Sequence, residues 1–188
     1  ARLLPMTDDP VRTIITTPTG EKRFQEYLVR DGAREDITAI RMEGLEASHP
    51  APGVVEAIGA ADTIVIAPSS PIVSIGTILG VPGVREAVAA RRDRVVAVSP
   101  IIGTAPVEGP AHKFLAGAGY PECTARQMAR IYADVAGTMV IHETDAEVAP
   151  VIEELDMRVV ATDILMPDIA ARERLARAVL GAMGDRKS

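Results

Sequence analysis

The chain has little of several features on which common protein functions depend. Cys123 is its one cysteine, which excludes an internal disulfide, and nothing points to secretion. No apolar run approaches the roughly 18 residues of a membrane span, and we expect no leader peptide. The densest basic cluster, Arg91, Arg92 and Arg94, is interrupted by Asp93, and the formal net charge is −6. We therefore expect neither a membrane nor a nucleic-acid partner.

Aromatic residues are also scarce, with two Phe, three Tyr and no Trp. Few large rings are then available to stack on a flat ligand, so we expect backbone and small polar groups to carry much of the binding. The familiar phosphate fingerprints are missing too. No Gly-x-Gly-x-x-Gly follows a predicted strand, and no Gly-Lys-Ser/Thr occurs, which excludes a Walker-type nucleotide hydrolase and disfavours a dinucleotide oxidoreductase.

What is present describes a globular protein with enough length for a real core. The chain has 188 residues, 47% of them hydrophobic and 24% charged. With no span, leader or disulfide expected, we predict a cytoplasmic location. The chain begins at Ala1 rather than at a Met, which is typical of a fragment or a processed form.

Residues 51–188 show strands alternating with helices. β-branched runs predict strands at 63–67, 95–98, 138–142 and 158–162, the first two buried on both faces. Helices are predicted at 53–61, 84–92, 111–118, 145–155 (capped by Asp145) and 168–183. This alternation implies crossover connections and a mainly parallel sheet. The predicted class is α/β, Rossmann-like, with helices on both faces.

Residues 1–50 follow a different pattern. Strands are predicted at 11–17, 24–30 and 37–42, with a turn at Pro18-Thr19-Gly20. Short strands with short loops indicate a small antiparallel segment attached to the sheet. We interpret residues 51–188 as a single α/β domain that lacks its amino-terminal part.

Two of the predicted parallel strands end in serine followed by proline. Serine at an N-cap and proline at the first helical position favour a helix start, and the free amides behind them suit a phosphate. Because ligands of such sheets bind beyond the carboxyl ends of the strands, these turns form a candidate anion site, although they could equally be simple helix caps. The candidate residues are Ser69, Ser70, Pro71, Ser74, Gly76 and Ser99.

A second candidate lies in the segment from Met6 to Pro10, which contains Asp8 and Asp9. Adjacent carboxylates in a turn could hold a magnesium ion that bridges phosphates, or one of them could accept a proton from an attacking hydroxyl. Asp-Asp-Pro is also ordinary turn chemistry, so both interpretations stay open.

The remaining chemically notable residues favour structural interpretations. The three histidines are scattered, without ligand spacing for zinc, and we interpret each as a surface or capping residue. Cys123 has no activating cation beside it in sequence. The methionines are interpreted as core filler: Met128, Met139, Met157 and Met166.

Six segments lie in order along nearly the whole chain: Leu4-Pro5-Met6-Thr7-Asp8-Asp9-Pro10-Val11-Arg12-Thr13, Phe24-Gln25-Glu26-Tyr27-Leu28-Val29-Arg30, Pro52-Gly53-Val54, Ala67-Pro68-Ser69-Ser70-Pro71-Ile72-Val73-Ser74-Ile75-Gly76, Val98-Ser99-Pro100-Ile101-Ile102-Gly103 and Glu108-Gly109-Pro110-Ala111. Taken together, they resemble the 2-phospho-L-lactate transferase family of coenzyme F420 biosynthesis. A sister family of sugar-metabolism regulators shares a similar proline-serine turn but lacks the Phe-Gln-Glu-Tyr segment.

The resemblance implies transfer of a phospholactyl or phosphoenolpyruvyl group from a guanosine-diphosphate-linked donor. The acceptor is the terminal ribityl hydroxyl of the deazaflavin Fo, GMP leaves, and magnesium assists. The serine turns, with Gly76, are implied to form the donor or acceptor pocket. Met6 and the catalytic candidates Asp8 and Asp9 are implied to line the same cleft from the other side.

Two departures from the family pattern bear on these expectations. The family usually has Asn where this chain has Ser70. Its glycine-rich first strand-turn-helix and an Asn-x-Gly-Asp-Asp segment are absent here, so the main metal ligands would lie upstream and this chain alone would be inactive. The alternatives are a nucleotide- or nucleotide-sugar-binding regulator without transfer activity, and a truncated domain that acts only in assembly. A homodimer is the default oligomeric state.

Overall fold

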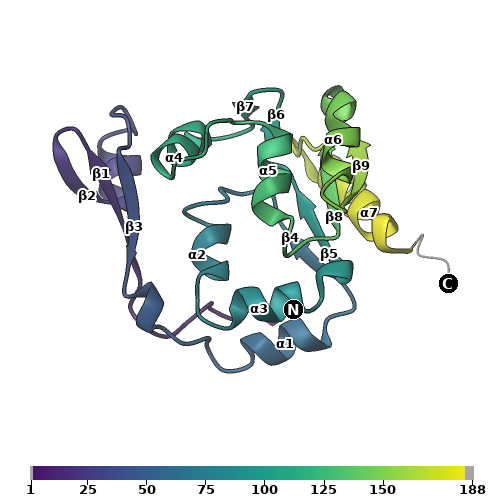
Figure 1. Cartoon of the computed structure of the whole chain (residues 1–188), viewed down its shortest axis with the longest axis horizontal. Coiled ribbons are helices and arrows are strands. Elements are labelled where there is room, and N and C mark those ends of the chain that lie inside the picture. Colours follow the sequence, from purple (N-terminus) through teal and green to yellow (C-terminus); the bar gives the residue numbers. More distant parts are fainter. Residues whose placement is uncertain (1, 185–188) are drawn as a thin grey trace.

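The structure, a computed structural model, describes residues 2–184. Four parallel strands form the main sheet in the order β4-β5-β8-β9: β4 (Ile64–Ile66), β5 (Val95–Val98), β8 (Thr138–His142) and β9 (Arg158–Thr162). Their spatial order follows the chain, so each connection crosses over in the same direction. The intervening helices are α2 (Ile75–Leu79), α3 (Val84–Ala89), α4 (Ala111–Gly117), α5 (Ala125–Tyr132) and α6 (Ala149–Glu153) (Figure 1).

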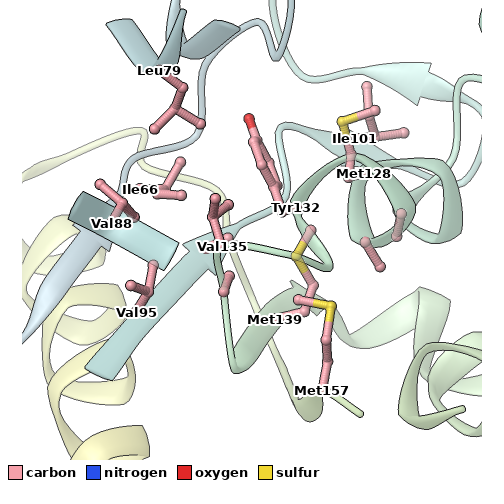
Figure 2. Packing of buried hydrophobic residues seen from close by; sticks show 14 of the residues in the cluster. Ile66, Leu79, Val88, Val95, Ile101, Met128, Tyr132, Val135, Met139 and Met157 are labelled. Carbon is pink, nitrogen blue, oxygen red and sulfur yellow. The ribbon is translucent and has the colours of Figure 1, made fainter. Parts of the chain in front are cut away.

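Helices cover both faces of this sheet. Successive side chains of a strand point to opposite faces, so each face has its own hydrophobic core beneath the helices. One core takes Val95 and Ala97 of β5 and packs them against α3 and α5, with Tyr132 and Met139 in its centre (Figure 2). The other core takes Val96 and Val98 and is closed by α7 (Ile169–Gly184). The predicted α/β class with helices on both faces is therefore confirmed.

A second sheet, antiparallel and three-stranded, lies at the opposite end of the molecule (Figure 1). Its order is β2-β1-β3, with β1 (Arg12–Thr17), β2 (Gly20–Arg23) and β3 (Ala39–Glu43). The predicted turn at 18–20 is confirmed, and Gly20 has a φ of 128°, a value that suits glycine. The short helix α1 (Val54–Ala60) and the 3₁₀ turn η2 (Leu45–Ala47) lead to the parallel sheet. The boundary between residues 1–50 and 51–188 stays a prediction, and 185–188 lie outside the described residues.

The predicted strand at 24–30 is wrong. After β2 the chain turns into the π-helical segment η1 (Glu26–Arg30). Phe24, Tyr27 and Leu28 stand at helical spacing. Tyr27 belongs to the core cluster that contains Phe114, and Phe24 and Leu28 are partly buried against that cluster. A helical turn brings these three side chains to one side, which a strand cannot do.

Two further expectations need correction, and two features of the fold were not predicted. Strand β4 is an edge strand with Val65 46% exposed, so it is not buried on both faces. Asp145 does not cap a helix through 155: it lies inside a 3₁₀ segment, η4 (Glu143–Val148), which His142 caps by accepting the Thr144 amide. Helix α5 was not predicted, and neither was the small hairpin of β6 (Ile101–Ile102) and β7 (Ala105–Pro106). No helix within residues 2–184 is long and apolar enough to cross a membrane.

Candidate functional site

A cavity of about 940 Å³ opens at the carboxyl ends of β4, β5 and β9. This is the edge where ligands of parallel α/β sheets bind. Its walls come from the segment after β2, the loop after β4, the loop before α4, and the connection from β9 to α7. The lining residues used below are Phe24, Leu28, Ser69, Ser70, Ser74, Ser99, Glu108, Phe114, Leu165, Met166, Pro167 and Arg172.

The serine turn after β4, residues Ser69–Ser74, forms one wall of the cavity. The Ser70 hydroxyl accepts hydrogen bonds from the amides of Ile72 and Val73, each at 3.3 Å. The turn is therefore fixed by a side chain, as the sequence indicated. However, α2 begins only at Ile75, so Ser70 and Pro71 do not start the helix directly. Ser69, Ser70 and Ser74 line the cavity.

Pro71 and Gly76 lie behind this wall and do not line the cavity. A Cβ atom at position 76 would stand 2.5 Å from the Pro71 carbonyl oxygen. The glycine is thus needed for close backbone packing under the serine turn. A direct approach of the Gly76 backbone to an anion stays a prediction.

Ser99 lines the cavity, but it starts no helix. Its buried hydroxyl donates to the carbonyl of Ile101 and accepts from the Ile101 amide, each at 3.1 Å. These bonds turn the chain from β5 into β6, because the segment after Pro100 is a hairpin. The helix start that a Ser-Pro pair favours is not used here, because residues after Pro100 pair as the strands of the hairpin instead.

Both phenylalanines of the chain line the cavity. The rings of Phe24 and Phe114 pack with their centroids 5.7 Å apart, and Leu28 extends this apolar wall. The Tyr27 ring packs against the Phe114 ring with their centroids 6.2 Å apart. The Tyr27 hydroxyl donates a hydrogen bond to the carbonyl oxygen of Glu35 at 2.7 Å. The expectation that backbone and small polar groups would carry much of the ligand binding stays a prediction, but it overlooked this aromatic wall. The quoted Phe-Gln-Glu-Tyr segment was the signal for it.

Only two of the lining side chains are ionisable, Glu108 and Arg172. They come from different walls, the loop before α4 and the first turns of α7, and neither forms an ion pair within residues 2–184. The cavity therefore offers one carboxylate and one guanidinium that do not neutralise each other. The sequence predicted neither residue as a site residue.

The connection from β9 to α7 forms the last wall. Met166 lies on it and is 39% exposed, so its interpretation as core filler is wrong. Met128, Met139 and Met157 are buried as expected. Asp163 anchors this connection: its carboxylate accepts from the Leu165 amide at 2.9 Å and from Arg174 at 2.6 Å.

These contacts of Asp163 have an electrostatic consequence. The Leu165 amide and, less strongly, the charges of Arg174 and His142 hold the pKa of Asp163 below its usual value. The His142 ring lies 3.7 Å from the same carboxylate and is nearly buried. His142 is thus a buried capping residue next to the connection, which agrees with the capping interpretation.

The acidic pair of the first segment lies outside the cavity lining. Asp9 accepts hydrogen bonds from the amide and ring of His49, at 2.8 and 3.2 Å, and these contacts lower its pKa. Asp8 is exposed. Met6 packs against the main core, and its carbonyl accepts from the Ala51 amide. The structure therefore does not bring these residues together with the serine turn, and their catalytic role stays a prediction.

The described residues do not fit a metal site made by protein ligands alone. Across residues 2–184 no group of three or more His, Cys, Asp or Glu side chains is placed to hold an ion. Glu108 is the one carboxylate at the cavity, and Asp9 is engaged by His49. Magnesium in phosphate-transfer sites typically needs one or two carboxylates together with substrate phosphates.

Comparison with known proteins gives the family. A family model described as 2-phospho-L-lactate transferase CofD matches residues 1–179. The chain is 46% identical over 184 residues to the phosphoenolpyruvate transferase of Streptomyces griseus, covering 95% of this chain and 58% of that protein. It is 37% identical over 181 residues to the 2-phospho-L-lactate transferase of Methanothermobacter thermautotrophicus, covering 96% and 57%. The chain thus spans less than three fifths of these relatives and matches their carboxy-terminal portion.

A solved structure shows the same fold. The UPF0052 family protein from Bacillus halodurans superimposes with a TM-score of 0.63 over 94% of this chain and 60% of that one. The two sequences are 18% identical, so this likeness concerns the fold alone.

Proposed function

We propose that the chain, which belongs to the 2-phospho-L-lactate transferase CofD family, forms the carboxy-terminal part of a transferase of coenzyme F420 biosynthesis. The reaction moves a phospholactyl or phosphoenolpyruvyl group from a guanosine-diphosphate-linked donor to the deazaflavin Fo. The terminal ribityl oxygen of Fo forms a bond to the phosphorus that carries the acid. The bond from that phosphorus to the bridging diphosphate oxygen breaks, and GMP leaves.

One observation carries this proposal: the cavity sets an aromatic wall beside a serine turn. The apolar wall of Phe24, Phe114 and Leu28 suits the flat deazaflavin ring, because aromatic rings pack face to face with an offset or edge to face. The hydroxyls of Ser69 and Ser74 suit phosphate oxygens as hydrogen-bond donors. The volume of about 940 Å³ is ample for a ligand of this size.

The chemistry that these residues supply is positioning. Phosphoryl transfer requires the attacking and leaving oxygens to be held in line, and it requires charge to be offset at the transferred group. In this proposal the serine turn orients the phosphoryl group and the aromatic wall orients Fo. Glu108 accepts a hydrogen bond from a ribityl hydroxyl, since it is the carboxylate at the cavity.

For the donated acid we propose phosphoenolpyruvate. Three relatives named phosphoenolpyruvate transferase are 43–46% identical to the chain, whereas those named 2-phospho-L-lactate transferase are 34–37% identical. Magnesium dependence, a cytoplasmic location and a homodimer belong to the same proposal. When bound, magnesium would offset phosphate charge. Within residues 2–184, the side chains form no complete site for it.

The test is GMP release from guanylated phosphoenolpyruvate in the presence of Fo and magnesium. It compares this chain with a fusion in which the amino-terminal portion of the Streptomyces griseus relative precedes it. We expect release from the fusion and weak or no release from the chain alone. Deazaflavin fluorescence measures Fo binding in parallel. A fusion that binds a guanine nucleotide, releases no GMP and does not bind Fo would favour a regulatory binding protein instead.

A further inference from the structure

One cationic side chain, that of Arg172, lines the cavity. Arg172 lies in the first turns of α7 and lines the cavity beside Leu165, Met166 and Pro167. Its side chain is exposed to the cavity mouth and has no hydrogen bond or ion pair within the described residues 2–184. Two residues further on, Arg174 is paired with Asp163 at 2.6 Å. Asp163 is therefore paired with Arg174, and Arg172 lines the cavity without an ion pair among the described residues.

The backbone that carries Arg172 is held firmly. Asp168 caps α7, with its carboxylate accepting from the Ala171 amide at 2.8 Å, and its carbonyl accepts from the Arg172 amide at 3.2 Å. Ala171 and Leu175 bury the inner side of the helix. The guanidinium thus projects from a fixed helix end. The Asp168 carboxylate thus occupies one of the free amides at this helix end.

We propose that Arg172 binds the carboxylate of the three-carbon acid that is transferred. A guanidinium presents a planar pair of N–H donors that matches a carboxylate, and it keeps its charge at any relevant pH. The apolar side chains of Leu165, Met166 and Pro167 lie beside it and suit the small hydrocarbon part of the acid. The serine turn suits the phosphate of the ligand. The phosphorylated acid would therefore place its phosphate at the serine turn and its carboxylate at Arg172.

The rest of the cavity supports this division. Glu108 is the other ionisable lining side chain, and its charge disfavours a carboxylate near the loop before α4. The neighbouring wall of Phe24 and Phe114 offers no donor for an anion. Arg172 is therefore the cavity side chain that attracts a carboxylate most strongly. The choice of ligand rests on the proposed function, whereas the position of the cation does not.

The test measures two dissociation constants by calorimetry on the 188-residue chain. The probes are 2-phospho-L-lactate and isopropyl phosphate, which differ by replacement of the carboxylate with a methyl group. We expect the unmodified chain to bind 2-phospho-L-lactate more tightly. Arg172→Gln should weaken that binding about tenfold and leave isopropyl phosphate within about twofold, because one charge-assisted contact is lost. Arg172→Lys should restore part of the loss.

Arg177→Gln is the matched control, since Arg177 lies on the same helix, is exposed and does not line the cavity. It should change neither constant. Equal loss for both probes in Arg172→Gln would assign the arginine to the phosphate and overturn the proposal. Equal binding of both probes by the unmodified chain would overturn it as well. A carboxylate preference that depends on Arg172, found together with no GMP release from the fusion, would keep Arg172 as the carboxylate-binding residue of the cavity, and it would reject the proposed function and with it the transferred acid as the ligand.

Discussion

Both carboxylate oxygens of Asp145 lie within hydrogen-bond distance of the Gly103 amide, at 2.9 and 3.0 Å. Asp145 is 9% exposed, and Gly103 stands at the turn of the β6–β7 hairpin with a φ of 60°. This contact joins the segment after β8 to the hairpin after β5. The hairpin leads directly into Val107 and Glu108 of the cavity wall, so a buried acid outside the cavity holds one side of it in place.

Replacing Asp145 with alanine is expected to lower the free energy of unfolding by about 1–3 kcal/mol. The Gly103 amide would then lose its charged acceptor in a partly buried place. The measurement is the midpoint of urea unfolding. The dependence of the unfolding free energy on urea concentration should stay the same, so that a lower midpoint reports lower stability. Glu147→Ala is the control, because Glu147 is exposed in the same 3₁₀ segment, and it should stay within about 0.5 kcal/mol. Equal midpoints for the two variants would contradict a structural role for the contact.

The Asp145 contact also shows where prediction from sequence succeeds and where it fails. The strands 95–98, 138–142 and 158–162 were predicted because their β-branched runs are local signals. The role of Asp145 was missed because its partner lies 42 residues away along the chain. The lining of the cavity was missed for the same reason, because Phe24 and Arg172 both line it although they lie far apart in the sequence. A serine-proline pair predicts that a strand ends there. Whether a helix or a hairpin follows depends on contacts with distant parts of the chain, which the local sequence does not show.

Gly76 and Gly59 should respond in opposite directions to the same substitution. Gly76→Ala places a Cβ 2.5 Å from the Pro71 carbonyl oxygen, and this backbone contact must shift, at a cost of about 1–3 kcal/mol. Gly59 lies inside α1 with nothing within 4 Å of an added Cβ. Gly59→Ala should therefore stabilise the chain by about 0.5–1 kcal/mol, because the glycine is costly in a helix. The measurement is the thermal unfolding temperature of each variant compared with the unmodified chain. A Gly76→Ala variant as stable as the unmodified chain would contradict the packing explanation for this glycine.

Ser70→Ala and Ser70→Asn separate the hydrogen-bonding role of Ser70 from its size. Alanine cannot accept from the Ile72 and Val73 amides, so the serine turn should lose about 0.5–2 kcal/mol. Asparagine accepts well at such positions and should keep the turn. In the fusion, we expect GMP release to fall about tenfold for Ser70→Ala and by less than threefold for Ser70→Asn. Equal loss in both variants would show that the hydroxyl contacts the ligand rather than the turn.

An ion-pair cluster on the antiparallel sheet predicts a loss of stability in acid. Arg30 and Lys22 lower the pKa of Asp31 to about 2, and Lys22, with Thr17 and Thr19, lowers the pKa of Glu35 to about 2. Lys22 lies 2.9 Å from Asp31 and 2.6 Å from Glu35. Because folding lowers both pKa values, their contribution is complete above the ordinary values of 3.8 and 4.5 and is lost as the pH falls towards 2.

Lys22→Met should therefore make stability less dependent on pH between about 4.5 and 2. The measurement is the urea midpoint at pH 7 and at pH 3 for both proteins. Arg12→Met is the control, since Arg12 lies 4.0 Å from the exposed Glu43, and it should leave the pH dependence unchanged. A Lys22→Met variant that loses as much stability in acid as the unmodified chain would show that other carboxylates govern acid unfolding.

The aromatic wall of Phe24 and Phe114 is expected to contribute to the affinity for Fo, which can be measured without catalysis. Phe24→Leu keeps an apolar side chain at the cavity but removes the ring that packs against Phe114. If the deazaflavin lies on this wall, the dissociation constant of Fo should rise about fivefold, equivalent to about 1 kcal/mol of lost ring packing. Val29→Ala is the control, because Val29 lies in η1 shortly after Phe24, is 73% exposed and does not line the cavity. Deazaflavin fluorescence gives the constants, and the urea midpoints show whether the fold is kept. An unchanged Fo affinity in a stable Phe24→Leu variant would place the ring of Fo elsewhere in the cavity, and the wall would then be part of the scaffold alone.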